Sequence, residues 1–221
     1  MSTYSVGEAT KERIIAVCKE LFYEKGLRGT SYNDICDKAD INRGLLPYHF
    51  KSKNNIAKIV FSEFIEDFEA ISKKTIVTDN FNVYFAIALF LLFDLISKNH
   101  NLRRFYSEIE TEERFISSTM MLQEDIINQI LAANQLHFEN DELRTIICMF
   151  EGVETEIIRN MHNGYITEPV EKVVVRDIYF VFSQLGFERT QIDMIIKEAK
   201  AIFNKYEMRM GESFTLELIK R

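Results

Sequence analysis

The sequence contains no tryptophan, and its 221 residues include only two prolines and eight glycines. Proline and glycine interrupt helices and mark tight turns. Their scarcity therefore argues against a chain of many short strands joined by turns. Leu, Ile, Glu, Lys and Phe dominate instead, with apolar residues at 47% of the chain. This composition predicts an all-α protein with a substantial apolar core.

Cysteine is also scarce, and its spacing excludes two common site types. Cys18, Cys36 and Cys148 are far apart among apolar neighbours, with no Cys-x-x-Cys pair and no Cys/His cluster. We therefore expect neither a disulfide framework nor a metal site, but small buried side chains in a reducing cytosol. No Ser/His/Asp grouping, Gly-rich phosphate loop or HExxH motif occurs either. We predict no catalytic residue and no cofactor, and an enzyme is the main rival class.

Long hydrophobic runs are absent too. The longest, residues 83–93, is too short for a bilayer, which needs about 20 apolar residues, and reads as a helix buried on every side. The first residues are polar and show no signal-peptide pattern. We expect a soluble, cytoplasmic protein without membrane contact.

The net charge of −7 is unevenly distributed along the chain. Residues 1–58 carry 10 Lys and Arg against 7 Asp and Glu, and the remaining residues carry 17 against 27. A basic N-terminal region on an acidic body favours an approach to phosphate.

Capping residues and apolar periodicity predict three short N-terminal helices. The first runs from Thr10 to Lys25 and stops at Gly26, the second from about Ser31 to Lys38, and the third from Arg43 to about Phe50. Ser31 and Asp34 form a capping-box pattern at the second helix. Two short helices around the tight turn 39–42 have the spacing of a helix-turn-helix. We assign residues 1–53 to a three-helix DNA-binding domain.

A larger helical domain, residues 54–221, is predicted to follow. Apolar stripes and polar links predict its helices near 54–76, 82–98, 102–112, 115–134, 141–163, 169–185 and 189–207.

A series of motifs runs without a gap through residues 11–61. It comprises Ile14-Ile15, Leu21-Phe22, Lys25-Gly26, Thr30-Ser31, Asp34-Ile35, the segment from Ala39 to Gly44, and the segment from His49 to Lys53. These motifs resemble the DNA-binding region of the tetracycline-repressor (TetR) family. The resemblance covers about a quarter of the chain; the rest shares only helical character and length with the family. It implies a homodimeric transcriptional regulator with a helical ligand-binding domain.

The N-terminal residues of the third helix are the candidates for reading bases. A recognition helix presents its first residues to the major groove. Arg43 can donate two hydrogen bonds to a guanine, Gly44 permits close approach of the backbone, and Leu45 can contact a thymine methyl. The alternative for Arg43 is a solvated charge at a helix start.

Phosphate contacts are predicted on both sides of this helix. Thr30 and Ser31 present hydroxyls and amides at a helix N-terminus, which suits an anion. The resemblance implies that Lys53 and Tyr48 clamp the DNA backbone, with Lys51 and His49 beside them. For His49, packing and capping inside the domain is an equal alternative.

Two residues depart from the family pattern. Pro47 stands where the family has a tyrosine, and it disfavours helical geometry at Leu46. We expect the third helix to be kinked or to end early, with Tyr48 replacing the lost contact. Asp40 stands where the family favours glycine, and aspartate tolerates the left-handed conformation that the turn needs.

Aromatic and Met residues of the larger domain could line an apolar effector cavity. The candidates are Tyr84, Phe105, Tyr106, Met120, Met121, Phe150, Glu154 and Tyr179. The alternative is that the apolar ones are merely core. For Glu154, in the middle of an apolar stripe, the alternative is an ion pair with Arg159 or another arginine.

The last two predicted helices carry a second apolar stripe, which we assign to a four-helix dimer interface. Its residues are Val174, Ile178, Phe182, Ile192, Ile195, Ile196, Ala199 and Phe203.

These expectations combine into a repressor that binds double-stranded DNA at a palindromic operator and is released by a small hydrophobic or aromatic effector. A dimer would hold its heads about 34 Å apart, one DNA turn. A purely structural helical adaptor is the second rival. The sequence names neither the operator, the effector nor the regulated genes, and it does not separate repression from activation.

Overall fold

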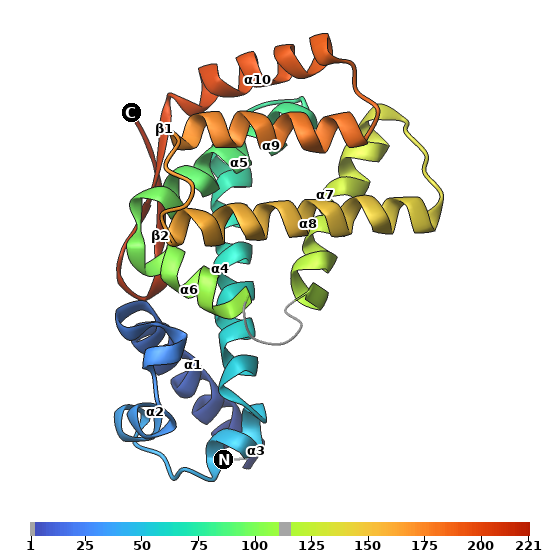
Figure 1. Ribbon diagram of the computed structural model, residues 1–221. Coiled ribbons are helices and arrows are strands. Elements are labelled where there is room, and N and C mark those ends of the chain that lie inside the picture. The colour runs from blue at the N-terminus through green and yellow to red at the C-terminus, as the bar shows by residue number, and fades with distance from the viewer. Residues whose placement is uncertain (1–2, 111–115) are drawn as a thin grey trace.

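The computed structural model (Figure 1) describes the backbone of residues 3–110 and 116–221 and the side chains of residues 7–109 and 124–221. These residues form ten α-helices and one two-stranded antiparallel sheet. The helices are α1 (Thr3–Gly29), α2 (Tyr32–Ala39), α3 (Leu45–Phe50), α4 (Lys53–Thr75), α5 (Phe81–Lys98), α6 (His100–Glu110), α7 (Ile116–Asn134), α8 (Asn140–His162), α9 (Val170–Gln184) and α10 (Arg189–Phe203). The strands are β1 (Tyr206–Met210) and β2 (Leu216–Lys220).

Helices α1 to α3 pack around the first turns of α4 and form the head at one end of the molecule (Figure 1). The head core contains the predicted stripe of α1 together with apolar residues of α2, α3 and α4. These are Ile14, Cys18, Leu21, Phe22, Ile35, Leu46, Phe50, Ile56 and Val60. Helix α1 begins earlier than predicted, at Thr3 rather than Thr10. The predicted stop at Gly26 is confirmed, since φ there is 79° and the helical conformation is interrupted.

Helix α4 runs from the head into the body, the unit of α5 to α10 (Figure 1). The body is built around α5, which α6, α7, α9, α10 and β1 contact. Within the described residues, α5 is the one helix long and apolar enough to cross a membrane, but 61% of that window is buried inside the protein. It matches the predicted helix that is surrounded on every side. Its apolar character is therefore explained by its place in the core.

The stripe predicted as a dimer interface packs inside the same chain. Ile178, Phe182 and Ala199 have no exposed surface, and Phe203 stacks on Phe90 of α5 with ring centroids 5.4 Å apart. The other members of the stripe are buried as well: Val174, Ile192, Ile195 and Ile196. Helices α9 and α10 use these residues to cover α5. The assignment to a dimer interface is therefore wrong, because the same helical spacing serves a partner within the chain.

The C-terminal hairpin is the element that sequence analysis missed. Residues 204–207 were assigned to the last helix, but α10 ends at Phe203 and β1 begins at Tyr206. Strands β1 and β2 pair antiparallel from Tyr206 opposite Lys220 to Met210 opposite Leu216. The hairpin lies along α4 and α5, and its tip reaches α1 in the head (Figure 1).

The prediction that all three cysteines are buried is correct for two of them. Cys18 and Cys36 lie in the head core, whereas Cys148 is exposed on α8.

Candidate nucleic-acid interface

Helices α2 and α3 are joined by a tight turn whose geometry matches the sequence prediction. Asp40 adopts the left-handed conformation with φ of 50°, and its backbone N–H donates to the carbonyl of Cys36. The amide of Ile41 donates to the same carbonyl at 3.1 Å. Aspartate tolerates this conformation, so the turn forms without glycine.

Pro47 neither kinks the reading helix nor ends it early. Helix α3 begins at Leu45, two residues later than predicted, and ends at Phe50. Pro47 is thereby the third residue of the helix, where an N–H has no partner inside the helix. The result is a helix of six residues held by Leu46 and Phe50, both buried. The expectation of a kink or an early end is therefore wrong: the helix ends at Phe50, where the sequence placed its end, and is short because it begins late.

The predicted base-reading residues are exposed at the start of α3. Arg43 and Gly44 form the turn before the helix and face solvent, and Leu45 is half-buried. Tyr48 is 79% exposed, and its ring meets the half-buried ring of His49 edge-on at 4.9 Å. Lys51 is exposed at the C-terminal end of α3, with φ of 65°. The turn and α3 thus present a polar edge with a cation at each end.

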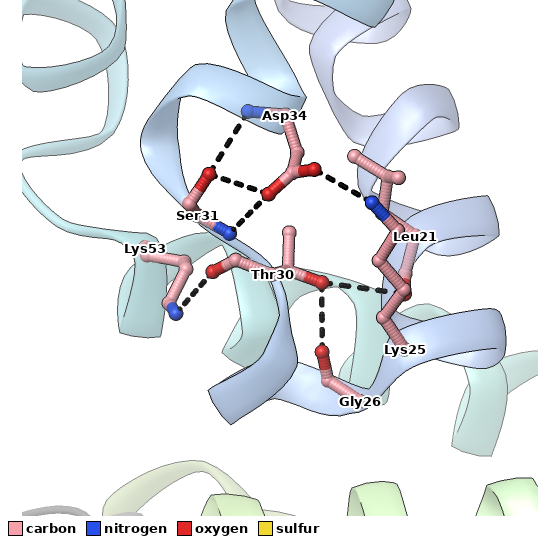
Figure 2. A network of polar contacts seen from close by, with 7 residues as sticks. All are labelled: Leu21, Lys25, Gly26, Thr30, Ser31, Asp34 and Lys53. Atoms are coloured by element: carbon pink, nitrogen blue, oxygen red, sulfur yellow. Dashed lines mark hydrogen bonds and ion pairs between the residues drawn. The ribbon is translucent and has the colours of Figure 1, made fainter.

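The side chain of Thr30 does not face this edge. It is 1% exposed, and its hydroxyl donates to the carbonyls of Gly26 at 2.7 Å and Leu21 at 3.3 Å (Figure 2). These carbonyls lie where the break at Gly26 interrupts the helical ladder, so they need other donors. The prediction of a phosphate-binding hydroxyl is therefore wrong for Thr30.

At the N-terminus of α2 a carboxylate of the chain itself occupies the anion position. The capping box is confirmed: Ser31 N–H donates to Asp34 at 2.8 Å, and Asp34 N–H donates to the Ser31 hydroxyl at 3.1 Å. The Lys25 ammonium lies 2.6 Å from the other Asp34 oxygen (Figure 2). This ion pair, together with Ser31, holds the pKa of Asp34 well below its usual range. A phosphate near the exposed Ser31 would therefore meet a negative charge.

Lys53 joins three elements of the head. Its ammonium donates to the carbonyls of Leu27 and Thr30, both at 2.6 Å, and its backbone N–H donates to the Tyr32 hydroxyl at 3.0 Å. A cation suits carbonyls that a helix end leaves without partners. The structure therefore assigns the Lys53 ammonium to the carbonyls between α1 and α2 and not to a phosphate clamp. Sequence reasoning could not see this, because Lys53 and Leu27 are 26 residues apart.

Replacing Lys53 with methionine is expected to lower the free energy of unfolding by about 1–3 kcal/mol, because two part-buried carbonyls lose a charged donor. Lys53→Arg should keep most of this stability. The salt dependence of DNA binding separates the two roles. A lost phosphate contact reduces the log–log slope by about 0.9, whereas a lost internal contact leaves the slope unchanged. We expect an unchanged slope.

Lys51→Met is the matched control for this experiment. Lys51 is exposed and two residues away, so its loss should leave chemical denaturation unchanged. A reduced slope with full stability for Lys53→Met would contradict the internal role.

A second site lies in the body, between α4, α5, α7 and α8. A mainly apolar cavity of about 120 Å³ opens there. Its lining includes rings and aliphatic side chains with a few polar groups: Phe61, Ile65, Phe68, Glu69, Lys73, Phe81, Tyr84, Phe85, Ala88, Leu89, Leu92, Tyr106, Ile126, Ile127, Gln129, Phe150 and Glu154. Glu69 and Lys73 form an ion pair at 2.8 Å. Burial, with a smaller contribution from Glu69, raises the pKa of Tyr84 to about 12.

Four of the predicted cavity residues line this space: Tyr84, Tyr106, Phe150 and Glu154. Arg159, one proposed partner of Glu154, forms an ion pair with Glu156.

Two other predicted cavity residues lie elsewhere. Phe105 is fully buried against Phe22 of the head, with ring centroids 5.6 Å apart. The Tyr179 hydroxyl donates to Asp193, and its ring lies 5.7 Å from the Arg189 guanidinium, between α9 and α10. Their helical positions were compatible with the cavity, but these helix faces point away from it. The side chains of Met120 and Met121 lie outside the described residues.

Three helices with a tight turn and an exposed short third helix form a helix-turn-helix arrangement. Residues 14–59 match the family model described as "Bacterial regulatory proteins, tetR family". The match covers the head and the first turns of α4, so this N-terminal region is similar to that family.

Its relatives include the probable HTH-type transcriptional regulator YttP of Bacillus subtilis (strain 168). The two are 34% identical over 134 residues, which are 56% of this chain and 63% of YttP. The HTH-type transcriptional repressor KstR2 of Mycolicibacterium smegmatis is 31% identical over 64 residues, 29% of this chain and 31% of that protein. The chain thus spans less than two thirds of either relative. Both relatives are named as HTH-type regulators of transcription.

The crystal structure of RolR in complex with the ligand resorcinol has a similar fold. Its TM-score is 0.60 at 15% identity, and the match covers 89% of this chain and 95% of RolR. At this identity the similarity concerns the fold alone. It extends through the head and the body and supports the all-α fold class with an N-terminal helix-turn-helix.

Proposed function

We propose that this chain is a cytoplasmic, homodimeric transcriptional repressor that binds a palindromic operator and is released by a small apolar effector. The observation that carries the proposal is the exposed start of α3, with Arg43 and Gly44 in solvent directly after the turn. In helix-turn-helix proteins these positions reach the base edges. The tetR-family match over residues 14–59 supports it.

In this proposal the bases are read by Arg43, Gly44 and Leu45. Tyr48 and Lys51 contact phosphates, because both are exposed beside the reading residues. His49 is half-buried beside Tyr48 and contributes a contact at the end of this edge. Ser31 caps α2 with Asp34 and is not part of this edge. The Lys53 ammonium and the Thr30 hydroxyl stabilise the head from inside.

The effector occupies the cavity of the body. Its lining of rings from α4, α5, α6 and α8 suits an aromatic or otherwise apolar molecule, and Glu154 offers one acceptor for a donor on the ligand. RolR, whose fold is similar, was crystallised with resorcinol, a small aromatic molecule. Such a ligand is compatible with the space available here.

Helix α4 connects the two sites. It contributes Phe61, Ile65 and Phe68 to the cavity, and two residues separate its first residue from the end of the reading helix. An effector that binds better to a second arrangement of α4 would move the heads. It would shift the balance only by its difference in affinity for the two arrangements.

The second copy of the chain is proposed to pack on α8 and α9. The stripe first considered for this role is buried in the chain, whereas other apolar side chains of α8 and α9 remain accessible. Met149 is 47% exposed on α8. Val153 on α8 and Val175 and Phe180 on α9 are half-buried. The two helices pack against each other through the ring contact of Phe150 and Phe180 (Figure 1). Together they could supply half of a four-helix interface.

The test is selection of duplexes from a random pool by the purified protein, followed by titration of the recovered sequence over a salt series. We expect a palindrome and a steep loss of affinity with salt, with a slope near −0.9 for each phosphate contact. A structural adaptor would recover no sequence and show a flat response. Recovery of no sequence, or a flat response to salt, would refute the proposal that the protein is a DNA-binding regulator.

The effector half of the proposal is tested by linkage. Small aromatic compounds are titrated into the free protein and into its operator complex. A ligand that weakens DNA binding must itself bind the complex more weakly by the same factor. Binding with equal affinity to both forms would contradict release by the effector.

A further inference from the structure

The tip of the C-terminal hairpin is inserted between the head and the body. The Phe214 ring is 3% exposed and contacts three rings on three helices. Its centroid lies 5.4 Å from Tyr23 of α1, 6.4 Å from Phe64 of α4 and 4.7 Å from Phe105 of α6. Phe105 in turn stacks on Phe22 of α1 at 5.6 Å. We name these five rings the junction cluster.

The hairpin is anchored to the body along its whole length. The Tyr206 hydroxyl donates to the carbonyl of Thr75 at the end of α4, at 3.4 Å. Met208 is 2% exposed, and β1 packs on α5 while β2 packs on α4. The strands therefore hold the tip at a fixed place beside the head.

The tip has a costly backbone conformation. Ser213 and Phe214 are both left-handed, with φ of 56° and 63°, although neither is glycine. Such residues persist only where their surroundings hold them. Burial of the phenylalanine ring is stabilising and can offset the cost of this backbone. The conformation of the tip therefore depends on its seat in the junction cluster.

Among the described residues, α4 and α6 also join the head to the body. Helix α4 passes through both parts. Helix α6 places Arg104 on the end of α1, where its guanidinium donates to the carbonyls of Tyr23 at 2.8 Å and Glu24 at 2.9 Å. The approach is close: a side chain at Gly26 would come within 2.6 Å of Glu108. The hairpin tip adds a third connection, because the Phe214 ring lies against α1, α4 and α6 at once.

We propose that the hairpin is a strut that fixes the orientation of the head, with Phe214 as a positioning residue for DNA binding. The Phe214 ring fills the gap between the aromatic rings of α1, α4 and α6. The effect on DNA binding rests on the proposed function, but the fixed orientation of the head does not. Phe214 touches no base or phosphate in this proposal; it acts through α1.

The first experiment measures orientation without DNA. Spin labels are placed at Asp37→Cys on α2 and Lys197→Cys on α10, both exposed, in a Cys148→Ser background. Dilution with unlabelled protein leaves only distances within one chain. We expect one narrow distance with Phe214 present and a broadened or shifted distribution in Phe214→Ala. Phe214→Tyr should restore the narrow distance.

Phe203→Ala is the matched control. It removes the same ring from the body, where Phe203 stacks on Phe90, far from the head. A loss of stability alone should leave its distance distribution narrow. If Phe214→Ala fails to fold, Phe214→Leu, which shortens the contact without emptying it, gives the same readout. An unchanged distribution in a folded Phe214 variant overturns the strut.

The second experiment measures binding to the selected operator and to versions with one base pair added or removed between half-sites. If only about a tenth of the variant dimers keep both heads in the competent orientation, affinity falls roughly tenfold. Because loosened heads fit several spacings, discrimination between the spacers should fall as well. A merely structural role would not change the ratio of the affinities for the different spacers. If wild-type protein binds no DNA, the proposed function fails while the distance measurement still decides the strut.

Discussion

Replacing Arg43 with alanine is expected to weaken operator binding by about 1–3 kcal/mol for each half-site, the range for one bidentate contact to guanine. A dimer loses the contact twice, so the dissociation constant should rise by roughly two orders of magnitude or more. Thermal unfolding should be unchanged, because Arg43 is exposed in the turn before α3. Fluorescence anisotropy with operator and random duplexes measures both affinity and specificity.

Arg43→Lys separates base reading from charge. Lysine keeps the positive charge but lacks the planar pair of donors, so specificity should fall while the salt slope stays near that of wild type. Arg144→Ala, an exposed arginine of α8, is the control for a general loss of charge. If Arg43→Ala binds the operator as tightly as wild type, α3 does not read DNA through this residue.

The second large effect is expected at Asp177, a carboxylate of α9 that is 1% exposed. Neither of its oxygens has a hydrogen-bond partner among the described residues. Burial raises its pKa to about 7, from an ordinary value of 3.8. The folded protein therefore holds a proton that the unfolded chain releases. Its stabilising effect is complete below about pH 4 and is lost as the pH rises through 7.

Between pH 5 and pH 8 the free energy of unfolding of the wild type should fall by roughly 3 kcal/mol from this group. Asp177→Asn cannot ionise, and its stability should be nearly flat over the same range. Urea denaturation at several pH values measures the difference. Glu198→Gln, an exposed carboxylate of α10, should keep the wild-type slope. Parallel curves for wild type and Asp177→Asn would show that the carboxylate does not titrate in this range.

Local patterns of the sequence predicted the helices well. The body helices α5 to α9 lie within about two residues of their predicted bounds. The turn at Asp40 and the capping box of Ser31 and Asp34 were also predicted correctly, because each depends on residues close in sequence. Helix spacing and capping are local properties, and they do not depend on what packs where.

The errors concern partners that are distant in sequence. The stripe through Ile178 and Ile196 was read as a dimer interface, but an apolar stripe does not say whether its partner is a second copy or α5. Lys53 was read as a phosphate ligand, although its carbonyl partners lie more than twenty residues earlier. The hairpin was missed because its strands are short. The positive φ angles at its tip also fall on residues other than glycine, so no glycine dipeptide marks the turn. For Phe105 and Tyr179, the sequence indicated the face of the helix on which each residue lies, but not which element packs against that face.

The seat of Phe214 also bears on how the protein is made. Tyr23 leaves the ribosome 191 residues before the ring that covers it, a delay of roughly 10–40 s at common elongation rates. During that interval the three-helix head can fold, since its core is local, but its orientation toward the body is not yet fixed by the hairpin. Closure between ends so far apart in sequence is slow, because a long loop must be ordered first. Nascent chains should therefore pass through a stage in which the head is folded but its contact with the hairpin has not yet formed.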